Sequence, residues 1–436
     1  MNSEEIFRLF QAIGAAALKY DIEDSHSGNI AMKWLDENGT LRMAITATGS
    51  QKGDLEIDHI CFPGIDKTTY GHYKASSETD VHAAILSLPG VFGSMHGHTK
   101  YATLVTLDDL PKPPQAPLPP LRPIDPLGFY HLGGEVPVRW LRVPTGSREA
   151  VRFVLEDLRD HEATYIQGHG PFARGKSVEH AFFNLCLVEH SGYILHFARL
   201  IGVNVPALQR EIEASPEAFF AAHPRPYLLE DHKRCDFKDE PETVSAFLKT
   251  GRRIFESRLS PFHTGSISLR AVDTMLYAPK ASMPDGLPGP LLEVPLRIEK
   301  GDDPELLVHK WIYHESSLQS VIHAYVPEAE VIHHYVYPGE DSPRNRIVPI
   351  DAEGSFLYLV IPVLPPRTDL DELIRNLVDY NTVVIRGGGV WSVGEQSLSE
   401  VLHHPSSVRD ICFYRIWAIA RGLDISKMEP ERSKSW

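Results

Sequence analysis

The stretch Gly93-Ser94-Met95-His96-Gly97-His98-Thr99-Lys100-Tyr101 decides how the rest of the chain is interpreted. Its two histidines, separated by one residue, follow an apolar run that begins at Ile85. In an extended strand, side chains two residues apart point to the same face, roughly 7 Å apart. Two imidazoles on one face can share a divalent metal ion when further ligands arrive from elsewhere. The pair alone is a weak signal, because a chain with 22 histidines often carries two on a half-exposed strand.

Length and composition limit the possible functions. A chain of 436 residues is expected to form two or three domains. The net charge of -15 argues against nucleic acid or an anionic membrane as a partner, but a local pocket can still hold a small anionic substrate. We find no apolar stretch long enough to span a membrane and no hydrophobic signal core. The four cysteines form no CxxC pair, which favours reduced thiols in a cytoplasmic protein: Cys61, Cys186, Cys235 and Cys412.

Hydrophobic periodicity predicts an α/β fold with three layers around a mixed or mostly antiparallel sheet. Helices are expected at 79–88 and 178–201, and the first leads into the strand that carries His96 and His98. The proline-dense segment 110–126 is expected to be an extended loop that covers the pocket, although a passive spacer has the same composition.

Five blocks of the first half recur in the same order in the second half, which predicts a tandem duplication. In both halves a glutamate precedes a strand histidine by eighteen residues. The paired blocks are 26–33 with 263–270, 48–49 with 273–282, Glu78 and His82 with Glu305 and His309, 96–98 with 323–325, and 166–171 with 385–390.

The two halves differ at the positions that could bind a metal ion. The first half has His96, His98 and His169 where the second has His323, Tyr325 and Gly388. We therefore expect a domain at 1–204 with an intact metal site, a linker at 205–240, and a degenerate domain at 241–436. The neighbouring pair His333-His334 has no carboxylate in a matching frame and is expected on a surface strand.

Glu78, His96, His98 and His169 together form a three-histidine and carboxylate set. Nitrogen ligands favour a borderline divalent metal over Mg²⁺ or Ca²⁺, with Zn²⁺ as the first choice and Mn²⁺, Co²⁺ or Fe²⁺ as further candidates. The carboxylate can stay bound to the metal, or it can leave when substrate enters and act as a general acid or base.

The order of these motifs resembles the class II aldolase/adducin superfamily, which includes L-fuculose-phosphate aldolase and L-ribulose-phosphate 4-epimerase. The motifs are Ser27-Gly28-Asn29, Ile45-Thr46-Ala47-Thr48-Gly49, Ser76-Ser77-Glu78, the stretch from His96 to Ala102, and Gly168-His169-Gly170. The resemblance covers residues 3–202 well and 241–422 in degenerate form. It implies that His96, His98 and His169 bind the metal and that Glu78 is the catalytic carboxylate. It also implies a pocket for a phosphate or carboxylate, lined by Gly28, Asn29, Thr48, Gly49, Ser76 and Ser77.

The resemblance implies a metal-dependent lyase. Such an enzyme performs aldol cleavage or decarboxylation through a metal-stabilised enediolate on a small phosphorylated or carboxylated sugar-like substrate. The epimerases have an aspartate in place of Glu78, which disfavours epimerisation. The alternatives are a non-catalytic, adducin-like scaffold, or an iron-dependent oxygenase or an epimerase of the same superfamily. The superfamily commonly forms cyclic tetramers with active sites between neighbours. We therefore expect a homo-oligomer in which the second half acts as a built-in neighbour, so that two chains form a four-lobed ring.

Overall fold

The computed structural model describes residues 1–24, 26–36, 38–63, 73–107, 117–220, 241–287 and 289–433. The chain divides into two compact units. Unit 1 comprises Met1–Pro123 and Leu127–His196, and unit 2 comprises Ile124–Pro126 and Phe197–Trp436. Among the described helices, none combines the length and apolar character needed to cross a membrane.

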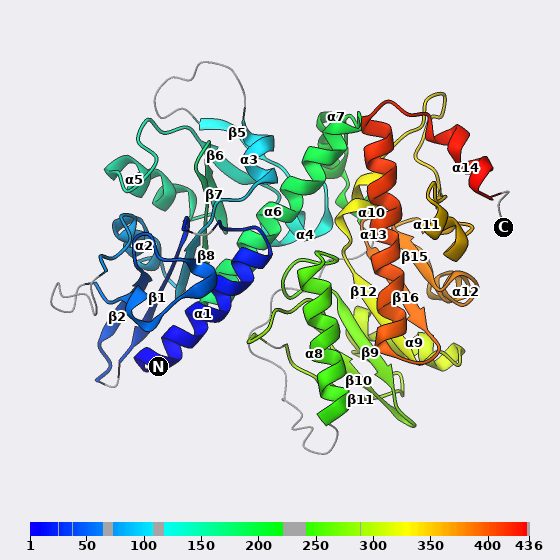
Figure 1. Cartoon of the computed structure of the whole chain (residues 1–436), viewed down its shortest axis with the longest axis horizontal. Coiled ribbons are helices and arrows are strands. Elements are labelled where there is room, and N and C mark those ends of the chain that lie inside the picture. Colours follow the sequence, from blue (N-terminus) through cyan, green and yellow to red (C-terminus); the bar gives the residue numbers. More distant parts are fainter. Residues whose placement is uncertain are drawn as a thin grey trace. The chain divides into compact units, whose positions relative to one another are not determined.

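Unit 1 is built on a mixed sheet of eight strands in the order β3-β2-β1-β4-β8-β7-β6-β5 (Figure 1). Neighbouring strands run antiparallel except β6 and β7, which are parallel. The strands are β1 Asn29–Leu35, β2 Leu41–Thr46, β3 Ile60–Cys61, β4 Gly93–His96, β5 Pro117–Leu121, β6 Val136–Arg139, β7 Ala163–Ile166 and β8 Gly170–Gly175.

Helices cover both faces of this sheet. On one face α2 and α5 pack against each other and bury an apolar cluster that includes Ile85, Phe153 and Phe172. On the other face lies α6, and its Leu185 would be 3.4 Å from a Cβ on Gly97, directly after β4. The helices are α1 Ser3–Lys19, α2 Thr79–Leu86, α3 Tyr101–Thr106, α4 Pro126–His131, α5 Arg148–Asp157 and α6 Val178–Leu200, with the 3-10 turns η1 Lys52–Asp54 and η2 Ile57–His59.

Unit 2 repeats the arrangement with a second eight-stranded sheet, in the order β11-β10-β9-β12-β16-β15-β14-β13. Its one parallel pair, β14 and β15, stands where β6 and β7 stand in unit 1. The strands are β9 Ser266–Arg270, β10 Thr274–Ala278, β11 Leu292–Pro295, β12 Ser320–Ala324, β13 Arg346–Ile347, β14 Ile361–Leu364, β15 Thr382–Ile385 and β16 Gly389–Gly394.

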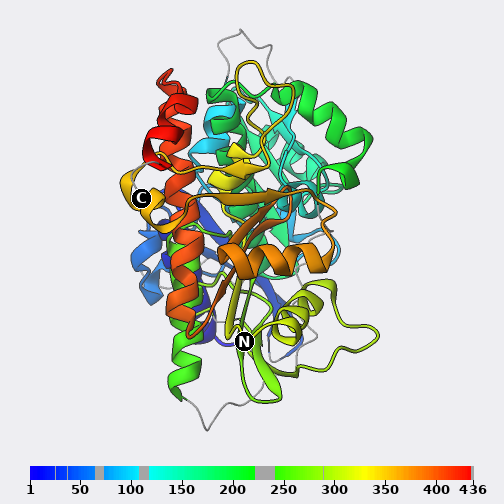
Figure 2. The same ribbon diagram turned by 90° about the vertical axis from the view of Figure 1, so that its right-hand side faces the viewer.

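The helices of unit 2 again form two outer layers. Helices α9 and α12 pack together over one apolar cluster, whereas α13 lies along β12 and β16 and contacts both α8 and α10 (Figure 2). The helices are α7 Val205–Ala214, α8 Pro241–Glu256, α9 Pro304–Glu315, α10 Pro327–Ile332, α11 Ala352–Leu357, α12 Leu370–Tyr380, α13 Leu398–Ala420 and α14 Ile425–Ser433, with the 3-10 turn η3 Pro216–Ala218.

Strand register confirms the tandem duplication and the three-layer α/β fold. In unit 1 Asn29 lies opposite His96, and in unit 2 Ser266 lies opposite His323. The turn that carries His169 is closed by the strand pair Ile166 and Gly170. The equivalent pair in unit 2, Ile385 and Gly389, closes the turn between β15 and β16. Two sheets with the same strand order and the same register have one common architecture.

Two segments differ from the sequence interpretation in detail. Residues 117–121 of the proline-dense segment form the edge strand β5, where a residue without an N–H group is tolerated. Helix α7 occupies the start of the predicted linker, while 108–116 and 221–240 lie outside the described residues. The domain bounds at 204 and 241 therefore stay a prediction.

Candidate metal centre

The four residues expected to form the metal site come from three different parts of unit 1. His96 ends β4, His98 lies two residues beyond that strand, His169 occupies the tight turn between β7 and β8, and Glu78 is the N-cap of α2. One ring nitrogen of each histidine lies within 4.8 Å of the other two. The Nε2 atoms of His96 and His169 are 3.2 Å apart. The fold thus brings together the three imidazoles that the sequence singled out.

The carboxylate of Glu78 faces two of these rings. Its Oε2 lies 3.7 Å from Nε2 of His96, and its Oε1 lies 3.8 Å from Nε2 of His169. The side chain is buried, and Oε1 has no hydrogen-bond partner among the described residues. A buried carboxylate oxygen without a partner is costly unless a cation or a proton satisfies it. The residues present therefore fit a divalent ion.

The ring of His96 is fixed in the orientation that a metal ligand needs. Its Nδ1 donates to the carbonyl of Pro171 (2.8 Å), which leaves Nε2 directed at His169 and Glu78. The ring stacks on Phe172 with centroids 4.2 Å apart and an angle of 15° between the planes. A backbone carbonyl that holds the second nitrogen is the usual support for a metal-binding histidine.

A buried chain of hydrogen bonds orients Glu78 from the other side. Oγ of Ser94 contacts Nδ1 of His82 (2.8 Å), and Nε2 of His82 contacts Oδ1 of Asn29. The amide nitrogen of Asn29 then donates to Oε2 of Glu78 (2.9 Å). His82 thus acts on Glu78 through Asn29.

Burial keeps the imidazoles of this centre neutral. Burial, with a smaller contribution from the neighbouring His96, lowers the pKa of His169 to about 3. Burial also places the pKa of His96 well below its usual value and lowers the pKa of His98. Neutral imidazole is the form that binds metal ions.

Two glycines allow the ligand loops to approach each other. A Cβ on Gly170 would lie 2.1 Å from the carbonyl oxygen of Gly97 and 3.1 Å from the ring of His96. A Cβ on Gly97 would meet Ile22 at 2.7 Å. Gly170 therefore allows the loop that carries His169 to approach the loop that carries His98, and Gly97 allows the latter to pack against Ile22.

The residues expected to bind an anion lie in two neighbouring segments. The backbone N–H of Thr48 donates to Lys74, and its hydroxyl donates to the carbonyl of Ala75 (3.0 Å), so the Thr48-Gly49 turn lies beside Ser76 and Ser77. Open space surrounds Gly49, and Ser77 is exposed.

Asn29 and Ser76 have contacts that the anion prediction did not include. The Asn29 side chain is occupied by Glu78 and His82, and the hydroxyl of Ser76 accepts from the backbone N–H of Glu78 (3.2 Å). Gly28 has a positive φ of 74° and lies against the carbonyl of His96. These three residues therefore support the carboxylate and the His96 strand directly.

Sequence reasoning missed two buried titratable side chains beside the centre, Lys52 and Glu23. The ammonium of Lys52 donates to the carbonyl of Ser50 (2.8 Å), and its charge adds to the lowering of the pKa of His96 and His98. Both carboxylate oxygens of Glu23 are buried without a hydrogen-bond partner among the described residues, and burial raises the pKa of Glu23. The position of Lys52, just after the Thr48-Gly49-Ser50 turn, was the available signal.

In unit 2 the corresponding centre is closed by hydrogen bonds. His323 stacks on Trp391 as His96 stacks on Phe172, but Nδ1 of His323 contacts Glu305 (3.0 Å) and its Nε2 donates to the carbonyl of Gly388 (2.8 Å). Both ring nitrogens are thus occupied, in agreement with the loss of ligands at Tyr325 and Gly388.

The expectation for His333 and His334 was wrong. They lie at the buried end of helix α10 rather than on a surface strand, and Glu330 supplies a carboxylate beside them. A carboxylate was expected only at the position equivalent to Glu78. That expectation overlooked the spacing of three and four residues that places side chains on one face of a helix.

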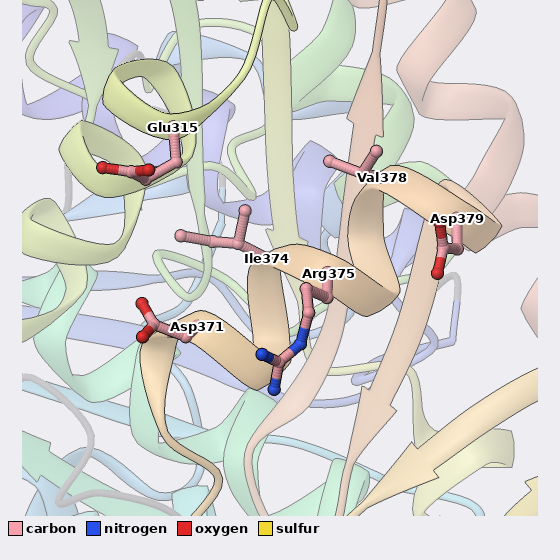
Figure 3. Close-up of a pocket in the computed structure, with 6 residues that line it drawn as sticks. All are labelled: Glu315, Asp371, Ile374, Arg375, Val378 and Asp379. Atoms are coloured by element: carbon pink, nitrogen blue, oxygen red, sulfur yellow. The ribbon is translucent and has the colours of Figure 1, made fainter.

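A groove in unit 2 has different chemistry. Figure 3 shows its lining, which comes from α12 and the end of α9 and encloses ≈ 520 Å³. Three of the six lining side chains are carboxylates, so the groove does not suit an anionic substrate. The lining residues are Glu315, Asp371, Ile374, Arg375, Val378 and Asp379.

Known proteins resemble the chain in both halves. The family described as "Class II Aldolase and Adducin N-terminal domain" matches residues 8–196 and 245–414. L-fuculose-1-phosphate aldolase from Thermus thermophilus is 26% identical, with a TM-score of 0.39, over 45% of this chain and 95% of that protein. A sugar-phosphate aldolase from Thermotoga maritima is 22% identical (TM-score 0.39) over 46% and 97%, respectively. A putative aldolase/epimerase/decarboxylase from Escherichia coli is 21% identical (TM-score 0.38) over 44% and 89%. Since the family match covers most of the chain in two regions, the protein belongs to the class II aldolase and adducin family, with its domain present twice in tandem.

Proposed function

We propose that the protein is a metal-dependent lyase that breaks a carbon–carbon bond in a small phosphorylated or carboxylated sugar-like substrate, by aldol cleavage or decarboxylation. The observation that carries the proposal is the convergence of His96, His98 and His169 beside the buried carboxylate of Glu78. Membership of the class II aldolase family supports the same reaction class.

The three histidines would hold the metal, with Zn²⁺ as the first candidate because three imidazoles suit a borderline ion. A divalent ion bound there would act as a Lewis acid on the oxygens of the substrate. Glu78 would move the proton, because its Oε1 has no hydrogen-bond partner among the described residues and faces the histidine cluster. Asn29 would hold the other oxygen of Glu78 in place.

The anionic group of the substrate would bind beside this cluster. We assign it to the region of Gly49 and Ser77, where the surface is open, with Thr48 and Ser76 shaping the adjoining backbone. The buried ammonium of Lys52 adds positive charge close to His96 and His98, which favours an anion in this part of unit 1.

The non-catalytic alternative receives less support from the same observations. A non-catalytic scaffold does not require three imidazoles to converge with a buried carboxylate, as they do around His96. We place the enzyme in the cytoplasm, which the buried free thiols of Cys61, Cys186 and Cys412 support.

Metal analysis and substrate screening test the proposal. The purified protein, supplied with Zn²⁺, Mn²⁺, Co²⁺ or Fe²⁺, is expected to cleave members of a library of sugar phosphates and sugar acids. Aldehyde formation then identifies aldol cleavage, and CO₂ release identifies decarboxylation. His98→Ala should abolish activity and remove about one equivalent of metal per chain. Metal content that is the same in His98→Ala and in the unchanged protein would overturn the proposed centre. A fully metal-loaded protein that cleaves no member of the library would overturn the proposed reaction.

A further inference from the structure

Unit 2 contains a cluster of one carboxylate and two imidazoles that the duplication does not explain. Nε2 of His333 lies 3.1 Å from Nε2 of His334. Oε1 of Glu330 lies 3.4 Å from the first of these nitrogens and 3.7 Å from the second. We propose that Glu330, His333 and His334 form a second binding site for a borderline divalent metal ion such as Zn²⁺. This inference does not rest on the proposed lyase activity.

The separations match those between ligands of one tetrahedral ion. Metal–nitrogen and metal–oxygen bonds of about 2.0–2.1 Å place neighbouring ligand atoms roughly 3.3 Å apart. The three distances in the cluster lie close to that value, and two imidazoles with one carboxylate are a common zinc-binding set. Mg²⁺ and Ca²⁺ prefer oxygen ligands and fit less well.

The cluster is buried and its polar atoms are not satisfied within the described part of the chain. Glu330 and His333 are 6% and 3% exposed. Oε1 of Glu330, the carboxylate oxygen that faces both rings, has no hydrogen-bond partner among the described residues. By contrast, both ring nitrogens of His323 in the degenerate centre are bonded. Unsatisfied buried groups indicate a further partner, and three converging ligand atoms indicate a cation.

Surrounding groups hold the two histidines in the neutral form that binds a metal ion. The backbone of Ile124, which belongs to unit 2, accepts a hydrogen bond from the ring of His334, as expected for a supported metal ligand. Arg386 donates to the carbonyl of His333 (3.3 Å), and burial together with its charge lowers the pKa of both histidines, so both rings are neutral. Burial and the nearby carboxylate of Asp125 raise the pKa of Glu330 well above its usual value, so a bound cation would be needed to hold this side chain in its ionised form.

The three proposed ligands come from a single helical turn, whereas the first centre combines ligands from a strand and from loops. Helix α10 is a single buried helical segment that ends at Ile332, and His333 is its C-cap. Side chains three and four residues apart lie on one face of such a turn, so Glu330 meets both histidines. The site is therefore independent of β12, which carries the degenerate copy of the first centre.

The second site can be isolated by disabling the first. We use His98→Ala protein as the background and compare it with His98→Ala/Glu330→Gln and His98→Ala/His334→Ala. Each is loaded with Co²⁺ and dialysed, and metal content and the visible absorption of bound Co²⁺ are measured. His314→Ala, which removes an exposed histidine, serves as the matched control in the same background.

The background protein is expected to retain about one equivalent of Co²⁺ with the absorption of a low-coordinate ion, and both double variants should retain less than about a fifth of that. The control variant should match the background. Circular dichroism verifies that each variant is folded, and the near-isosteric Glu330→Gln variant tests the site if His334→Ala does not fold. A background protein that binds no Co²⁺, or a Glu330→Gln variant that binds as much as the background, would overturn the proposal.

Discussion

At the residue scale, the proposed centre would separate metal binding from proton transfer. Three neutral imidazoles are expected to hold the ion, while Glu78 keeps one oxygen on Asn29 and turns the other toward the rings. A carboxylate held in this way can exchange a proton without displacing the ligands. The two roles should therefore respond differently to substitution.

Replacing Glu78 with glutamine tests that division. Glu78→Gln keeps the shape of the side chain and removes its basic oxygen, so turnover should fall by roughly 10²–10⁴-fold while the metal content is unchanged. Metal analysis and initial rates on the same preparation measure both quantities. Asp80→Asn is the matched control, because Asp80 is exposed on the same helix. Unchanged turnover in Glu78→Gln would remove this residue from the mechanism.

The sequence predicted individual ligands where spacing carried the signal. The ligand set of His96, His98 and His169 was predicted because each residue belongs to a short motif with a fixed place in the fold. Lys52 was missed because its role depends on burial, which no local pattern shows. The cluster at His333 was misjudged because a helix of six residues gives too short a periodic signal to be recognised.

At the scale of single elements, the turn between β7 and β8 controls the geometry of the centre. Gly170→Ala would place a methyl group against the carbonyl of Gly97 and the ring of His96. We expect the affinity for the metal to fall about tenfold or more, because the supports of a ligand ring tune its binding. Competition with a chromogenic chelator measures the affinity.

The control for this variant is Gly133→Ala. Gly133 also has a positive φ (74°), but a Cβ there meets nothing within 4 Å. Gly133→Ala therefore adds a methyl group at a positive φ without a close contact. Equal affinities for the Gly170 and Gly133 variants would show that close approach at Gly170 does not position the ligands.

Helix α13 carries a buried histidine that should make unit 2 sensitive to acid. Burial lowers the pKa of His404 to about 4, and its Nδ1 lies 2.5 Å from the hydroxyl of Tyr358. The unfolded chain, with a pKa near 6.5, binds the proton first, so stability is full above pH 6.5 and is lost as the pH falls toward 4. The contribution amounts to about 2 kcal/mol between pH 7 and pH 5.

Urea unfolding of the metal-free protein at these two pH values measures this effect. His404→Gln should lose less stability on acidification than the unchanged protein does. His314→Gln, which replaces an exposed histidine, should behave like the unchanged protein. The same pH dependence in all three proteins would contradict the assignment to His404.

At the scale of the whole molecule, the duplication bears on assembly. Each chain contains two copies of the aldolase domain. If four such domains form a closed ring, two chains are expected to complete it. Sedimentation of the active protein should show a dimer of the 48.9 kDa chain. An active species that sediments as a single chain would contradict this arrangement.

The sequence predicted the architecture more completely than the boundaries. Repeated blocks around His96 and His323 predicted two copies of one fold, and matching strand orders confirm them. The ends of elements were less certain, because α2 stops at Leu86 rather than Leu88 and part of the proline-dense segment forms β5. Such ends depend on neighbouring strands, which local periodicity does not contain.

The hydrogen bonds around His323 also have an evolutionary consequence. Its ring is anchored through Nε2 to Gly388 and through Nδ1 to Glu305, whereas the ring of His96 is anchored through Nδ1 alone. Restoring histidines at Tyr325 and Gly388 would therefore return two ligands to a centre whose third ring faces the wrong way. Reversion would need further changes before any of them conferred an advantage. Restoring the two lost histidines alone would therefore not rebuild the metal site in unit 2, because the ring of His323 would also have to change its hydrogen bonds.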